Sequence, residues 1–355
     1  MFTDAGKYAL INAKLRARIS TLLSEDYFAN LLKCPSLTEM FNFLRNGPFS
    51  DLSAIYERTG DLKTVEMELF RKEAVLFIDI EPHLPTDVLP LTRAFTAGYE
   101  IENLKNALRL FFDRSFRKRS IEDSVHYLLR TALLHSIPFD AVINSGSFDE
   151  IVELLSHTPY GSLIRNEIAR VDKMQSLFPM TVALDRYYYQ RLLDEAVNLA
   201  PRDKLIALRL IGIEIDLQNI NWIIRFRTFY NLSFDAIADI IIPGGLTVKG
   251  NTLQDVYRSQ QITAPLQAML RKSYPGIASL ISEQPQEQSP RLTLVERILE
   301  QIMLEEVRRI MCGYPFTVGI VIAYFILKRL EIKRIRTVLN AGLYHISRER
   351  TASLL

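Results

Sequence analysis

One eleven-residue segment occurs three times in this chain, without gaps, at residues 99–109, 215–225 and 330–340. The equivalent positions Asn103, Asn219 and Arg334 are 116 and 115 residues apart, close to one third of the 355 residues. In each copy, apolar residues recur at spacings of three and four, which predicts a buried stripe along a helix. The stripes are Ile101, Leu104 and Leu108; Leu217, Ile220 and Ile224; and Ile332, Ile335 and Leu339.

Two further landmarks move in step with this segment. Glu68, Asp185 and Glu300 precede the aligned positions by 35, 34 and 34 residues. Farther upstream, helix N-cap signals begin at Ser36, Ser147 and Thr252. Because the unit is far longer than the ~34 residues of a simple helical repeat, it predicts three separate helical domains. We therefore expect an all-α protein with domains at residues 1–119, 120–234 and 235–355.

Polar residues hold fixed places in the repeated segment. Asn103 and Asn219 are amides on an apolar helix face, so they need hydrogen-bond partners and are expected to tie adjacent helices together. The acidic position (Glu100, Asp216, Glu331) either faces the N-terminal end of a helix dipole or is solvated. The candidate structural residues of the repeat are Asn103, Arg109, Asn219, Arg225 and Asp185.

Composition excludes several classes of protein. The 43 Lys and Arg residues nearly balance the 41 Asp and Glu, which gives no global field toward nucleic acid. Residues 1–15 lack the apolar run of a signal peptide, and the apolar stretch at 314–327 is shorter than the ~20 residues of a membrane span. Cys34 and Cys312 lie among apolar residues and are expected to be buried thiols.

No catalytic or nucleotide-binding motif is present. The chain lacks GxxxxGK[ST], GxGxxG, HExxH, GxSxG and a paired CxxC, and its five histidines are widely separated. We expect no active site, metal or cofactor. Two basic clusters, one at residues 114–119 and one at 328–350, fit either contact with a protein or membrane surface or merely solvated helix ends.

Residues 8–18, 184–189 and 216–225 resemble the C-subunit family of bacterial and archaeal V-type/A-type ATPases, whose eukaryotic equivalent is the d subunit. The similarity runs over essentially the whole chain. It implies a funnel or socket of three related helical domains with pseudo-threefold symmetry. Such a protein would join the central rotor shaft of the soluble head to the membrane rotor ring of proteolipid subunits, on the cytoplasmic face and without a membrane span of its own.

The third copy departs from the repeat, because Arg334 replaces the asparagine and Asn340 replaces the arginine. Lys333, Arg334 and Arg336 are therefore candidate partner-binding residues, and Arg334 and Arg336 would face the central opening. Two other functions stay open at this point: a free helical scaffold or regulatory module with a concave binding surface, and an enzyme whose site forms between domains.

Overall fold

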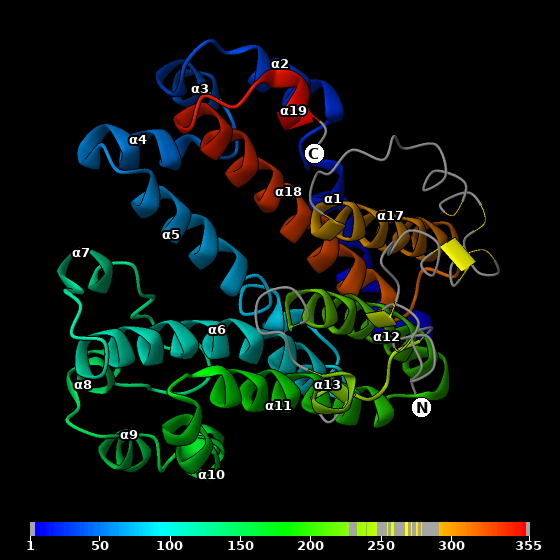
Figure 1. Ribbon diagram of the computed structural model, residues 1–355. Helices are drawn as coiled ribbons and strands as arrows, with labels where there is room; N and C mark the ends of the chain where they lie inside the picture. The colour runs from blue at the N-terminus through cyan, green and yellow to red at the C-terminus, as the bar shows by residue number, and fades with distance from the viewer. Residues whose placement is uncertain are drawn as a thin grey trace. The chain divides into compact units, whose positions relative to one another are not determined.

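The computed structural model describes residues 4–226, residues 233–246 apart from 239, residues 291–352 and isolated positions between 254 and 278. All regular secondary structure in this part of the chain is helical, so the all-α prediction is confirmed. In chain order the elements (Figure 1) are α1 (Asp4–Ser20), α2 (Glu25–Lys33), α3 (Leu37–Leu44), α4 (Ser50–Thr59), α5 (Leu62–Ala74), η1 (Glu81–His83), α6 (Leu89–Ser115), α7 (Glu122–Val125), α8 (Phe139–Asn144), α9 (Phe148–Leu154), α10 (Pro159–Met174), α11 (Phe178–Val197), α12 (Pro201–Arg225), α13 (Phe234–Ala238), α17 (Arg291–Cys312), α18 (Gly319–Leu343) and α19 (Arg348–Ala352).

The repeated segment lies in the three long helices, near the middle of α6 and in the second half of α12 and α18. The chain divides into two compact units, one of residues 1–16 and 189–327 and the other of residues 17–188 and 328–355. In the following, these are unit 1 and unit 2. The three predicted domain boundaries stay a prediction.

Unit 2 contains two apolar cores, and a long helix completes each of them. The first core joins the small helices α2 to α5 to α18, which contributes Ile332, Ile335, Val338 and Leu339. Each of these four side chains is at most 1% exposed. In Figure 1 the red α18 and α19 lie beside the blue helices of this group. The predicted stripe of the third copy is therefore correct.

The second core joins α8 to α11 to the long helix α6. The predicted stripe residues Ile101, Leu104 and Leu108 are all buried there. In Figure 1, α8, α9 and α10 gather beside α6 and α11. The stripe predicted for the middle copy is less accurate, because on α12 Leu217 is only partly buried whereas Ile215 is fully buried.

The predicted N-caps begin equivalent short helices in the two groups. Ser36 and Ser147 have extended backbones, and their side chains accept hydrogen bonds from the backbone N–H groups of Glu39 and Glu150. This geometry satisfies an N–H group that would otherwise have no partner in the first turn. The N-cap predictions are confirmed for α3 and α9, while Thr252 lies outside the described residues.

The apolar stretch at residues 314–327 leads into α18 and supplies core residues, with Val318 and Val321 fully buried. Among the described residues, the structure has no helix with the length and apolar character needed to cross a membrane. The expectation of two buried thiols is wrong, because Cys34 is partly exposed and Cys312 is exposed. Apolar neighbours in sequence did not predict burial here because both residues lie at helix ends, Cys34 as the C-cap of α2 and Cys312 as the last residue of α17.

Candidate functional site: polar ties along the three long helices

Asn103 and Asn219 each hold the backbone of one distant residue through two hydrogen bonds. Asn103 Nδ2 donates to Leu129 O at 2.7 Å, and Leu129 N donates to Asn103 Oδ1 at 3.0 Å. In the middle copy, Asn219 makes the same pair of bonds with Ile242, both at 2.9 Å. All four residues are buried. The amide thus replaces a backbone partner for a segment that belongs to no regular element, which buried N–H and C=O groups require.

The third copy uses different chemistry at these positions. Arg334 forms an ion pair with Glu25 at 2.5 Å, and its guanidinium lies 5.5 Å from the centre of the Phe28 ring. Asn340, which stands where the other copies have arginine, donates from Nδ2 to Glu66 Oε1 at 2.5 Å. Both side chains of α18 therefore contact the small helices α2 and α5 of unit 2.

The acidic position of the repeat is buried in every copy, with Glu100, Asp216 and Glu331 only 2%, 3% and 4% exposed. Because the three side chains are buried, this position is not solvated. It is not at a helix N-terminus either, since all three residues lie well inside long helices. The expectation from the sequence was wrong because it took these acids to be exposed. Acidic residues are buried only when they have partners, and the partners were not visible in the sequence. For Glu100 and Glu331, these partners come from segments far away in the chain.

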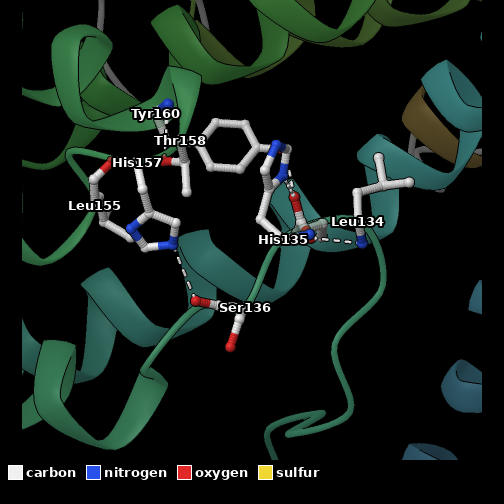
Figure 2. A network of polar contacts seen from close by, with 8 residues as sticks. Leu134, His135, Ser136, Leu155, His157, Thr158 and Tyr160 are labelled. Carbon is white, nitrogen blue, oxygen red and sulfur yellow. Dashed lines mark hydrogen bonds and ion pairs between the residues drawn. The ribbon is translucent and has the colours of Figure 1, made fainter.

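Glu100 binds a loop and a helix start at once. Its Oε2 accepts hydrogen bonds from the backbone N–H groups of Leu134 and His135 at 3.0 and 2.8 Å. Its Oε1 lies 2.6 Å from His135 Nδ1 and accepts from the Tyr160 hydroxyl at 2.7 Å. Figure 2 shows the edge of the Tyr160 ring close to His135, with 5.6 Å between ring centres. His157 Nε2 reaches Ser136 O in the same loop at 3.1 Å.

Glu331 makes the equivalent contact in the third copy. Its Oε1 accepts from the backbone N–H of Leu23 at 2.7 Å. Leu23 and Leu134 are 111 residues apart, the same separation as the N-caps Ser36 and Ser147. The two buried acids therefore bind corresponding places in the loops that lead into the two groups of small helices.

Pairs of charged residues join each long helix to a neighbouring helix. Lys105 of α6 binds Asp185 of α11 at 2.7 Å, and both side chains are largely buried, at 15% and 12% exposure. Burial raises the pKa of Asp185, more than the Lys105 ammonium lowers it. Burial also acts to lower the pKa of Lys105, but the carboxylates of Asp185 and Glu102 outweigh it and raise that pKa.

Equivalent helix pairs carry other ion pairs. Between α12 and α17, Arg209 Nε lies 2.6 Å from Glu306 Oε2, and Glu306 also binds Arg309 at 2.8 Å. Between α18 and α5, Arg329 lies 3.5 Å from Glu73. Glu306 and Glu73 are buried acids, so each pairing compensates a charge that burial would otherwise penalise.

The remaining candidate residues are Arg109, Arg225 and the three cations of α18. Arg109 is exposed and donates to Asn106 Oδ1 at 2.6 Å, while Arg225 is the last residue of α12, and its side chain lies outside the described residues. Lys333, Arg334 and Arg336 are partly buried on α18. Among the described residues, no group of three His, Cys, Asp or Glu side chains could hold a metal ion.

Comparisons with known proteins agree over nearly the full length. A family model described as ATP synthase (C/AC39) subunit matches residues 11–354. The C subunit of the A-type ATP synthase of Methanosphaera stadtmanae is 26% identical over 332 residues, covering 93% of this chain and 83% of the relative. Its counterpart in Methanothermobacter thermautotrophicus is 24% identical, covering 94% and 84%. The chain belongs to the ATP synthase (C/AC39) subunit family, in which its role is structural rather than catalytic.

Proposed function

We propose that this chain is the connector of the central stalk in a rotary A/V-type ATPase. In this role it receives the rotor shaft of the soluble head, rests on the membrane rotor ring at the cytoplasmic face, and transmits torque for ATP-coupled transport of protons or sodium ions. The support comes from the family and from one structural observation, the way in which the polar ties of one copy reach into the next.

That observation carries the proposal. Glu100 of the first copy binds the loop before the small helices of the second, and Glu331 of the third copy binds the equivalent loop at Leu23 of the first. Asn219 of the second copy binds Ile242, which follows the predicted second boundary. Such ties, each within one of the two units, support the proposal of a socket whose copies of the repeat hold together when a shaft enters it.

Torque transmission needs walls that do not shear past one another. The buried ties fit this need, because each one sets the position of a backbone segment or a helix in another copy, and breaking it exposes a buried polar group that costs about 1–3 kcal/mol. We include Lys333, Arg334 and Arg336 among the residues that contact the shaft or the ring, since only the third copy has cations at the positions of Lys333 and Arg334, and Arg336 extends this run.

Affinity purification from the native host provides the test. The tagged chain, extracted in mild detergent, is expected to retain both the soluble head and the membrane ring in fixed stoichiometry. Recovery of the chain without the head, or without the ring, would contradict the connector role. In the same complexes, cross-linking should place shaft and ring on different faces of the chain, whereas links confined to one outer edge would contradict the socket.

A further inference from the structure

A cavity of about 440 Å³ lies within unit 2, beside the first copy of the repeat. Its volume falls in the range of ~300–1,000 Å³ that is usual for small-molecule sites. The walls come from α5, α6, α18 and the segment that includes α7. They comprise Lys63, Glu66, Met67, Phe70, Asn103, Asn106, Arg109, Leu110, Asp113, Ser124, Tyr127, Leu128 and Arg336.

Three cations from three different helices line this cavity: Lys63 of α5, Arg109 of α6 and Arg336 of α18. Among the described residues, none of the three forms an ion pair with a carboxylate. Arg109 donates only to the neutral amide of Asn106, and the Lys63 ammonium lies 5.2 Å from the centre of the Tyr127 ring. Like charges that line one cavity repel one another, so three cations without an ion pair of their own favour an anion between them.

The two carboxylates in the wall already have partners. Glu66 accepts from the Asn340 amide at 2.5 Å, and Asp113 forms an ion pair with Arg117 at 2.9 Å. A third carboxylate, Asp61, is near the cavity but does not line it. It accepts hydrogen bonds from the Tyr127 hydroxyl at 3.0 Å and from the Thr64 hydroxyl at 2.7 Å. None of the partners given for these three acids is Lys63, Arg109 or Arg336.

The rest of the wall is divided between further donors and apolar surface. The Asn106 amide accepts from Arg109 through its oxygen, which leaves its N–H groups to donate, and Ser124 also lines the cavity. Met67, Phe70, Leu110 and Leu128 supply apolar surface. The cavity therefore matches a molecule with an anionic group and an apolar or aromatic body.

We propose that this cavity binds a small organic phosphate, with its phosphoryl group held by Lys63, Arg109 and Arg336. A phosphoryl group carries up to two negative charges and three acceptor oxygens, which suits three cations better than the two oxygens of a carboxylate. Guanidinium groups also bind phosphate through two parallel hydrogen bonds. The proposal goes beyond the stalk role and does not depend on it.

Calorimetric titration of the full-length protein at low ionic strength tests the site. The probes are adenosine monophosphate, inorganic pyrophosphate and adenosine. We expect both phosphates to bind saturably with one site per chain, and adenosine not to bind measurably. The changes Arg109→Gln and Arg336→Gln should each weaken phosphate binding at least tenfold, because each removes one charge-assisted contact.

Arg170→Gln provides the matched control, since Arg170 is an exposed arginine of unit 2 on α10 whose ion pair, in the part of the chain that the structure describes, is with Glu167. It should change the dissociation constant less than twofold. If either arginine variant fails to retain the wild-type circular dichroism spectrum, Lys63→Gln is tested in its place, since Lys63 is exposed. Absence of saturable phosphate binding, or equal weakening by Arg170→Gln, would overturn the proposal. Binding of a glutamate-rich peptide at this site, when neither phosphate binds, would also overturn the proposal, because the occupant would then be an acidic protein segment.

Discussion

Replacing Asn103 with alanine removes both hydrogen bonds that hold the backbone of Leu129 to α6. Leu129 is 6% exposed, so water cannot easily replace the lost amide. Each buried backbone group that loses its partner costs about 1–3 kcal/mol, and two such groups predict a loss of about 4 kcal/mol in the free energy of unfolding. Asn103→Asp should be no better: its carboxylate can still accept from Leu129 N–H, but it cannot donate to Leu129 O, and a charge buried beside that oxygen adds its own cost.

Urea unfolding followed by far-ultraviolet circular dichroism measures this loss as a lower transition midpoint with an unchanged slope. The control is Asn106→Ala, one turn further along the same helix. Asn106 is only partly buried, and its oxygen accepts from the exposed Arg109 side chain. Its replacement should cost less than about 0.5 kcal/mol, as is usual for substitutions at partly exposed positions away from buried networks.

The middle copy gives an independent check with a local probe. The single tryptophan, Trp222, is buried on α12 one turn after Asn219. Asn219→Ala should therefore lower the midpoint of the Trp222 fluorescence transition by an amount similar to the effect of Asn103→Ala on circular dichroism. If Asn103→Ala and Asn106→Ala unfold at the same urea concentration, the two-bond tie does not stabilise the fold and the reasoning fails.

The ion pairs predict further effects. Lys105→Met leaves the Asp185 carboxylate buried without its cation and should cost about 3–5 kcal/mol, whereas the double variant with Asp185→Leu should recover most of this loss; thermal or urea unfolding measures both. In Lys105→Met the pKa of Asp185 in the folded protein lies above its unfolded value of about 3.9, because burial raises it without an opposing ammonium. The folded state then holds the proton more tightly, so the deficit of Lys105→Met should be largest at neutral pH and shrink as the pH falls toward that value; a deficit that grows on acidification contradicts this sign. Arg209→Met should cost only about 1 kcal/mol, since Glu306 keeps its ion pair with Arg309; a loss as large as that of Lys105→Met would refute this reading of the second cation.

The periodic features of the sequence were sufficient to place the three long helices and the N-caps of α3 and α9. Apolar spacing reports which face of a helix is covered, and Ser36 and Ser147 satisfy backbone groups only a few residues away. Both signals are local, which is why they predict local structure well. The middle stripe was less accurate because α12 is apolar on several sides, so that Leu217 and Ile215 fit a stripe equally well by spacing alone.

The buried acids were missed for the opposite reason. Nothing in the sequence around Glu100 indicates that a loop 34 residues away will donate two backbone N–H groups to it. The same holds for Glu331, whose partner Leu23 is 308 residues away. The signal that was available is repetition itself: an acidic residue at the same place in three otherwise apolar helix faces is improbable for a solvated surface.

The position of Glu331 also bears on how the first copy of the repeat is covered. A chain of repeats ordinarily leaves its first copy with an uncovered face, which terminal capping structures then protect. Here α18 supplies that cover for the small helices α2 to α5, with apolar side chains and with Glu331, much as α6 does for α8 to α11 with Glu100. Within unit 2, the last copy of the repeat therefore covers the core of the first in the way that α6 covers the core of α8 to α11, and the equivalence of Leu23 and Leu134 is the residue-level observation behind this correspondence.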